Sequence, residues 1–258
     1  MEAIEASRSS EICTTAGAFD GSVIFHTIYD VIGFVLYMHQ QIPSTVQDMS
    51  IEFDTMHSEY SQLVSALAET EVKASQRRYH ISKMRDIKLG IRRLEKLMNA
   101  LSNMKNAIQL IIKAIPSIEE IILALGASPQ RPQHIYDLSF SHGTTGPSGA
   151  NDFDRSKAAD GLSRKAIRTL VSKGAGSVTY PGSSKLFLLI KAPSSFNQPQ
   201  HFLPKRDFRY NRKIMPFRLL FKCRNQCQEE VASTSEDLIW FQCRHVIKGL
   251  AMNTTAEE

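Results

Sequence analysis

EDLIWFQCRHVIKGL (Glu236–Leu250) lies close to the carboxyl end and contains the only tryptophan, Trp240, inside the apolar run Leu238–Phe241. Two further apolar residues at 246–247 precede Gly249. A run this apolar near a chain end belongs in a core, because a frayed end would leave it in water. We therefore predict that the end of the chain is threaded back across the rest of the domain. From physics alone, a plain last strand of a sheet explains the pattern equally well.

The length and composition are those of an ordinary globular protein, with 258 residues of which 42% are hydrophobic. Such a chain can bury one sizeable core. Its longest apolar runs, such as 118–125 and 186–190, are far shorter than the roughly 20 residues of a membrane span. The beginning, MEAIEASRSSE, lacks the basic and apolar parts of a signal peptide. We expect an intracellular protein without membrane association.

The cysteines give information on the redox compartment of the protein and on possible metal binding. Cys13, Cys223, Cys227 and Cys243 are too few and too unevenly spaced for a secreted disulfide framework. The last three form, with His245, a pattern of C-x3-C, fifteen residues, then C-x-H, and thiolate and imidazole are zinc ligands. The spacing differs from that of a standard zinc knuckle. We therefore favour reduced structural cysteines, with no bound metal and no cofactor.

The first half of the chain is predicted to be helical after a mobile tail at residues 1–20. Apolar residues recur at helical spacing over about 21–41, which predicts a core helix. Pro43 ends this helix. The sequence HQQIP before it predicts an exposed corner with Gln40 and Gln41 at the rim.

A weaker helical stripe spans residues 44–70, and a near-heptad apolar seam over 83–115 predicts one long helix. A coiled-coil dimer is less favoured than an intramolecular core, because Gly90 interrupts the seam. Between Lys73 and Lys113 there are eleven Lys and Arg residues against two acidic ones. The net charge of +5 is therefore concentrated here.

The second half of the chain is predicted to consist mainly of strands. We expect a hairpin at 118–125 and 135–140, although the first of these segments could also extend the helix. A flexible loop at 141–153 and a third helix at 155–173 follow. Further strands are expected at 185–191, at 216–222 and in the opening stretch. The fold class is α+β, with three helices against a mostly antiparallel sheet, forming one domain over residues 21–250 before a polar tail at 251–258.

The chain carries none of the catalytic motifs that a sequence reveals directly, such as a nucleophile elbow, a Walker loop, a dinucleotide fingerprint or a zincin helix. We expect a protein without catalytic activity. The basic helix could bind nucleic acid or chromatin through Arg77, Arg78, Arg92 and Arg93. Tyr79 is the only aromatic residue there that could stack on a base, so a solvated helix face is favoured, with an acidic protein partner as a further alternative.

Four blocks resemble the comet protein family, whose members bind the spindle-checkpoint HORMA protein Mad-two. They are YDVIGFVLYMHQQIP (Tyr29–Pro43), the segment from Ile91 through ILALGASPQRPQHIYDLSF, FLPKRDFRY (Phe202–Tyr210) and the opening stretch. Their order and spacing fit the family over roughly residues 23–250, and the last block is the most specific. Residues 47–82 are longer or more divergent than the family pattern.

The resemblance implies a HORMA-like fold without catalytic activity or cofactor, in which a carboxyl-terminal safety belt wraps over the sheet. Such a protein binds the closed form of a Mad-two-type HORMA protein and presents it to a hexameric AAA+ ATPase of the pachytene-checkpoint type. Checkpoint complexes would be disassembled in the nucleus and cytoplasm, at kinetochores or the spindle; meiotic chromosome-axis HORMA proteins would be related clients. The belt and core residues would be Ile239, Trp240, Phe241, Val246 and Ile247.

The resemblance also implies the contact residues. Gln40 or Gln41 would lie at the interface with the checkpoint protein, and Pro204 and Lys205 would meet the amino-terminal domain of the ATPase. Large aromatic residues are expected on the third helix in vertebrates, and losing such an anchor can cost about 2 kcal/mol or more. Aliphatic residues stand at those positions here. The third helix would contribute Arg164, Lys165, Ile167, Arg168 and Val171.

Overall fold

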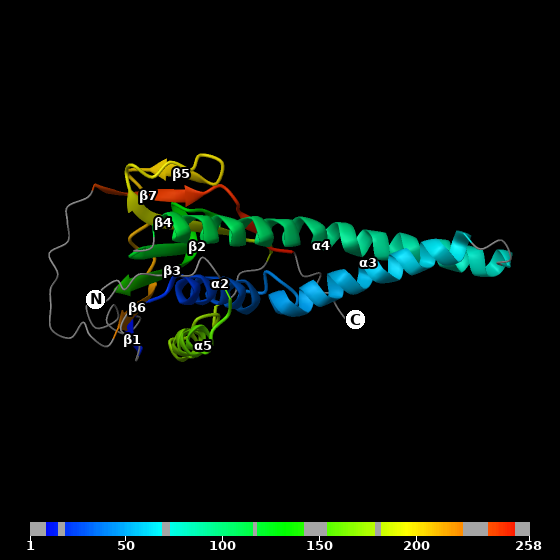
Figure 1. The fold of residues 1–258 in the computed structure, drawn as a ribbon, viewed down its shortest axis with the longest axis horizontal. Coiled ribbons are helices and arrows are strands. Elements are labelled where there is room, and N and C mark those ends of the chain that lie inside the picture. The colour runs from blue at the N-terminus through cyan, green and yellow to red at the C-terminus, as the bar shows by residue number, and fades with distance from the viewer. Residues whose placement is uncertain are drawn as a thin grey trace.

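The computed structural model describes residues 9–14, 19–68, 73–115, 118–141, 154–178, 182–223 and 237–250. Within them the chain forms four helices and eight strands (Figure 1). In chain order these are β1 (Ser9–Thr14), α2 (Gly21–Met38), α3 (Val46–Ala68), α4 (Ala74–Ala114), β2 (Glu120–Ser128), β3 (Arg131–Ser141), α5 (Lys157–Ser172), β4 (Lys185–Pro193), β5 (Phe202–Lys205), β6 (Phe217–Cys223), β7 (Leu238–Cys243) and β8 (Ile247–Lys248).

All eight strands belong to one sheet with the order β1-β6-β3-β2-β4-β7-β5. β8 follows β7 along the same edge of β4, at Lys185 and Leu186. β6 pairs in parallel with both β1 and β3, whereas the other pairs are antiparallel. The predicted α+β class with a mostly antiparallel sheet is therefore confirmed.

The two faces of the sheet are covered differently. Successive side chains of a strand point to opposite faces, so neighbouring residues of β2 enter different clusters. Leu123 belongs to the main core, which also contains buried apolar residues of α2, α5 and the inner part of α4 from Leu97 onward. Ile122 belongs to a smaller cluster with Phe208, Tyr210 and Ile214. The second face is thus covered by the connection between β5 and β6, residues 206–216, and we call this connection the crossing segment.

α2 is the central helix of the main core, as its apolar periodicity predicts. It is long and apolar enough to cross a membrane by length and composition. Ile24, Ile28, Val35 and Leu36, however, have no exposed surface, because the sheet, α4 and α5 surround them. Burial in the core therefore accounts for the composition of α2.

The expectation of three helices was wrong, because residues 46–68 form a complete helix. α3 runs antiparallel to the outer half of α4, and the two helices project from the body as a long arm (Figure 1). Met56 of α3 packs at Gly90, where an added Cβ would lie 3.0 Å from its sulfur atom. The side chains of Glu59 and Lys83 form an ion pair nearby. α4 accordingly begins at Ala74 rather than at residue 83.

The weak sequence signal of α3 has a physical cause. Met49 is the one buried residue of α3, since the helix packs on α4 alone along most of its length. A helix with a single neighbour needs only a narrow apolar stripe. The stripe over residues 44–70 was therefore a genuine helix signal.

The predicted mobile tail at residues 1–20 was wrong for Ser9–Thr14, which form β1. This strand extends the sheet beside β6, and Ile12 is buried against the main core. Lys165 of α5 donates from Nζ to the carbonyl oxygen of Cys13, at 3.2 Å. A single buried residue in six gives no periodicity, so the strand left no sequence signal. Residues 1–8 and 251–258, and all but Ser141 of the loop expected at 141–153, lie outside the described residues.

The end of the chain is an interior strand. β7 pairs with β4 on one side and with β5 on the other, so Phe241 is aligned with both Ile190 and Pro204. β5, four residues long, was missed inside the predicted loop between 191 and 216. After β5 the crossing segment passes over the sheet to β6, on the far side of β3. Residues 206–216 therefore cover the second face of the sheet, and β7 fills the place between β4 and β5.

Candidate partner-binding surfaces

The beginning of α5 is fastened to α2 by a short polar network. The Ser156 hydroxyl caps the helix by accepting from the backbone N–H of Ala159, at 3.2 Å. The Arg155 guanidinium donates to both carboxylate oxygens of Asp30, at 3.1 and 2.8 Å, and to Oδ1 of Asp160 at 2.5 Å. Its hydrogen bond lowers the pKa of Asp160. A bidentate pair of this kind fixes orientation, so α5 has a defined position on α2.

The outward face of α5 carries four of the five α5 residues predicted for the checkpoint-protein interface. Leu162, Ala166 and Leu170 are buried toward the core. At 100° per residue, the four others fall within one arc on the opposite side. Arg164, Arg168 and Val171 are exposed, with Val171 at 53%, and Ile167 is half-buried. We call these four the α5 face.

The fifth predicted residue, Lys165, does not belong to this face. Its ammonium group is directed at β1, where it donates to the carbonyl oxygen of Cys13. The hydrogen bond connects α5 to the edge strand of the sheet. Lys165 therefore has a role in holding α5 and β1 together.

A groove of about 630 Å³ lies beside the α5 face, between α2, α5 and the start of α3. Ile167 reaches it from α5, and Phe34, Tyr37 and Val46 reach it from the other side. Tyr37 is 48% exposed, on a helix that is otherwise largely buried. A groove with apolar walls beside two arginines can take an apolar side chain from a partner whose neighbouring residues are acidic. Tyr37 was not predicted as a contact residue, because the sequence does not show that α2 and α5 pack against each other.

The HQQIP corner is only half exposed. Gln40 is exposed and has a positive φ of 54°. Gln41, predicted to lie at the rim, is 2% exposed, so that expectation was wrong. Its Oε1 accepts from the backbone N–H of Ser184 at 2.6 Å, and its carbonyl oxygen accepts from the N–H of Leu250 at 2.8 Å. Gln41 thus fixes the chain end after β8 to the end of α2.

His39, beside this corner, is a buried structural residue. Its Nε2 shares a 2.6 Å hydrogen bond with the hydroxyl of Tyr136, and its ring lies 4.1 Å from that of His134. Burial and the neighbouring His134 lower the pKa of His39 to about 4. It is therefore neutral at pH 7 and contributes no charge to the surface.

Pro204 and Lys205, predicted to contact an ATPase, lie on β5 at the outer edge of the sheet. β5 pairs with β7 on one side, and no described strand pairs with its other side. Leu203 and Pro204 are exposed and Lys205 is partly exposed. Pro204 has no N–H to offer a further strand, which protects an open sheet edge from unspecific pairing. A loop or domain can nevertheless contact the exposed side chains.

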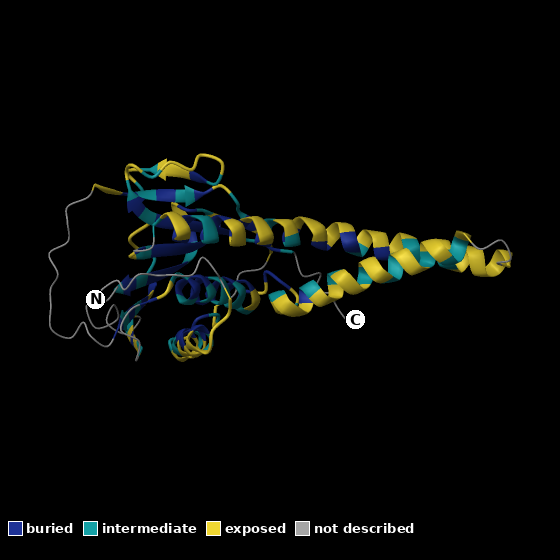
Figure 2. Cartoon of the chain, viewed as in Figure 1, coloured by how far each residue is buried: buried dark blue, intermediate teal, exposed yellow. Residues whose placement is uncertain are grey.

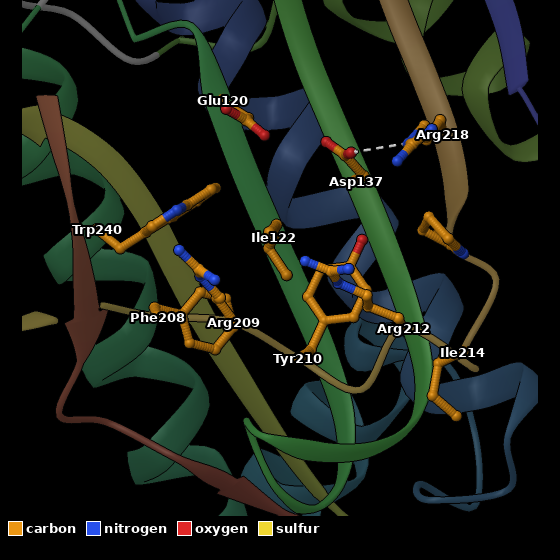
Figure 3. Close-up of a pocket in the computed structure, with 11 residues that line it drawn as sticks. Glu120, Ile122, Asp137, Phe208, Arg209, Tyr210, Arg212, Ile214, Arg218 and Trp240 are labelled. Atoms are coloured by element: carbon orange, nitrogen blue, oxygen red, sulfur yellow. Dashed lines mark ion pairs between the residues drawn. The ribbon is translucent and has the colours of Figure 1, made fainter. Parts of the chain in front are cut away.

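A pocket of about 420 Å³ opens where the crossing segment covers the sheet (Figure 3). Phe208 meets Trp240 edge to face, with ring centroids 5.7 Å apart, and Arg209 and Tyr210 are directed to the same space. Of the predicted belt and core residues, Trp240 and Val246 pack on this face of the sheet. The remaining three are buried in the main core, namely Ile239, Phe241 and Ile247.

One end of this pocket contains a buried carboxyl group. Asp137 is 8% exposed, and its Oδ2 lies 3.4 Å from Nε of Arg218 (Figure 3). Burial, followed by the nearby negative charge of Glu120, raises the pKa of Asp137 to about 6, against the effect of Arg218. Glu120 itself pairs with Lys191 at 3.0 Å. These acids are paired with bases of the same sheet, as in a structural network.

The zinc pattern considered above does not come together. Cys223 ends β6 and Cys243 ends β7, and three strands separate them, which corresponds to about 19 Å. His245 instead lies beside His201, with Nδ1 of His201 2.9 Å from Nε2 of His245. Among the described residues there is no group of three or more potential metal ligands. Cys227 lies outside them.

Two comparisons with known proteins give the context for these surfaces. No model of a protein family matches the sequence, and a search of curated proteins gave no match either. The function is therefore inferred from the resemblance of short blocks and from the surfaces described above.

We expect Gly249→Ala to destabilise the protein by about 1 to 3 kcal/mol, because the new methyl group would lie 2.8 Å from Cβ of Gln41 in a packed site. Gly161→Ala on α5 is the matched control, since an added Cβ there meets nothing within 4 Å. The control should be neutral or stabilising by about 0.5 to 1 kcal/mol. Urea unfolding measures both values, and equal stability of the two variants would contradict the packing of Gln41 on Gly249.

We expect the stability of the wild type relative to Asp137→Asn to fall as pH rises from about 4 to 7. At low pH the carboxyl group is protonated in both the folded and the unfolded protein, so folding buries no charge there. Above the folded pKa of about 6, the buried charge carries its full cost. The change is on the order of 2 to 3 kcal/mol. Urea midpoints across this range measure it, and a difference independent of pH would show that Asp137 is not perturbed.

Proposed function

We propose that this chain is a non-enzymatic, HORMA-like adaptor that binds the closed conformer of a Mad-two-type checkpoint protein and delivers it to a pachytene-checkpoint-type AAA+ ATPase. Remodelling by the ATPase would silence the spindle checkpoint. Meiotic axis HORMA proteins are proposed as further clients. The chain would act in the nucleus and cytoplasm, at kinetochores, the spindle or meiotic chromosomes.

The observation that carries the proposal is the position of β7. An adaptor that imitates a closed HORMA protein must hold its own sheet complete without a captured peptide. Here the chain supplies that strand itself, with β4 on one side of β7 and β5 on the other. The crossing segment then covers the outer face, as a belt would. The fold thus offers fixed outer surfaces and leaves no strand place open between β4 and β5.

The first of these surfaces is the α5 face, proposed to bind the checkpoint protein. Ile167 and Val171 replace the aromatic residues of the vertebrate pattern, which would remove large anchors from this helix. Tyr37 stands across the groove from Ile167 and supplies an exposed aromatic ring at the same place. Arg164 and Arg168 would select an acidic partner surface. Gln40 is retained as a contact residue, whereas the role of Gln41 is the internal one described above.

The second surface is the β5 edge with Pro204 and Lys205, proposed to meet the ATPase. α5 packs beside β1, the first strand in the sheet order, and β5 is the last. Six strand spacings separate the two edges, or about 30 Å. Figure 1 shows α5 and β5 at opposite ends of the sheet. Two partners could therefore be held at the same time, as an adaptor requires.

The test is co-elution of the full chain with the closed checkpoint protein, and then with the ATPase under a nucleotide that binds without turnover. We expect a one-to-one binary complex and a ternary peak. Arg164→Glu combined with Arg168→Glu should weaken the binary complex about tenfold or more, because charge reversal repels an acidic partner. Lys205→Glu should remove the ternary peak and leave the binary peak intact.

The control pair, Lys105→Glu with Arg131→Glu, changes the net charge by the same amount as the Arg164 and Arg168 pair, at exposed positions that belong to neither proposed surface. It should elute like the wild type in both experiments. Failure of the wild-type chain to form the binary complex would overturn the proposed client. Binding that survives reversal of Arg164 and Arg168 would exclude the α5 face as the interface.

A further inference from the structure

The arm formed by α3 and α4 has an outward side that the proposed adaptor function does not use. α4 turns Ile87, Ile91 and Leu94 inward, where they are buried. The arm lies away from both the α5 face and the β5 edge (Figure 1). Figure 2 shows that exposed residues dominate its surface.

Basic residues form a line along this outward side. Arg78, Arg85 and Arg92 are seven residues apart, and an α-helix drifts only about 20° over seven residues. They therefore lie nearly one above the other, over about 21 Å of α4. Lys88 lies beside this line, and all four cations are exposed. Within the described part of the chain, none of the four has an ion-pair partner.

Two large aliphatic side chains lie beside the line of basic residues. Ile81 is 54% exposed and Leu89 is 56% exposed. By helical spacing they flank Arg85 on either side, within about 40° of it. The two side chains are eight residues apart, about 12 Å along the helix axis, and lie on the same outward side as the arginines. The outward patch on α4 consists of Arg78, Ile81, Arg85, Lys88, Leu89 and Arg92, and we call it the α4 patch.

The chemistry of the α4 patch defines what can cover it. A second copy of this chain is disfavoured, because a twofold contact would set the same arginine line against itself. A nucleic-acid backbone would neutralise the cations but leave Ile81 and Leu89 in water. A partner helix with leucine-type residues along one stripe and Asp or Glu beside it would meet both requirements. Its acidic residues would pair with the cations and its apolar stripe would cover Ile81 and Leu89, as in a coiled coil with charged flanks.

We propose that the α4 patch is a docking site for an acidic amphipathic helix of a partner protein. The partner helix would lie along the arm as a third helix beside α3 and α4. Its carboxylates would pair with the arginines, and its apolar stripe would cover Ile81 and Leu89. This interaction uses other residues than those proposed at the α5 face and the β5 edge. A result that contradicts one of the three interactions therefore does not contradict the other two.

The probe is a synthetic three-heptad helical peptide with Leu in the stripe and Glu at the flanking positions. A second peptide has Lys in place of Glu, and a short DNA duplex serves as the polyanion. Fluorescence anisotropy with the full chain should show the Glu peptide binding about tenfold or more tightly than the other two. Arg85→Glu with Arg92→Glu should reduce that affinity about tenfold or more, and so should Ile81→Ser with Leu89→Ser.

The control is again Lys105→Glu with Arg131→Glu, which should bind the Glu peptide like the wild type. Circular dichroism establishes that each variant keeps its helices. Equal binding of the two peptides, or an equal loss in the control, would overturn the proposal. Tighter binding of the DNA duplex through the same arginines would make the patch a nucleic-acid site instead. A dimer of the chain that the patch variants dissociate would make it a self-association site.

Discussion

The hydrogen bonds of β7 to both of its neighbours are the interaction on which the rest of the fold depends. Among the described strands, β5 is attached to the sheet through β7 alone. The crossing segment begins at β5 and ends at β6, so its position over the sheet also depends on β7. Trp240 and Phe208, in edge-to-face contact, join the strand to that segment. Without β7, β4 and β5 would each expose a row of unpaired backbone groups.

A sheet completed in this way can hold surfaces at fixed distances from one another. The α5 face lies at the β1 edge, and Pro204 and Lys205 lie at the β5 edge. The network of Arg155 with Asp30 and Asp160 keeps α5 in place on α2. The arm places a third surface away from the sheet, because α4 continues from the core into solvent (Figure 1). Separate surfaces on one sheet and its helices would suit the proposed adaptor function.

Much of this fold could be predicted from the sequence, because periodicity reports burial on one face of an element. α2, the inner part of α4 and α5 were predicted in this way, and the hairpin of β2 and β3 was predicted from two apolar runs that flank turn residues. β1 and β5 were missed because each is short, and β5 contains Pro204. The burial of Gln41 depends on Ser184 and Leu250, which lie far away in the chain. A local pattern carries no information about such contacts.

The candidate surfaces also contain some residues that the sequence predicted and others that only the structure showed. The outward position of Arg164, Arg168 and Val171 follows from the periodicity of α5, so the sequence was sufficient. The groove beside Tyr37 and the engagement of Lys165 by β1 require the packing of elements that are distant in the sequence. The α4 patch could be recognised only from the arm, because the packing of α3 on α4 shows which side of α4 stays exposed.

Amide hydrogen exchange followed by mass spectrometry tests the central claim most directly. If β7 is an interior strand, peptides covering Leu238–Cys243 should exchange as slowly as those of β2 and β4, and β5 should be protected together with β7. Fast exchange in β7 and β5, with β2 and β4 still protected, would show that the end of the chain does not complete the sheet. The account of a self-closed adaptor would then fail.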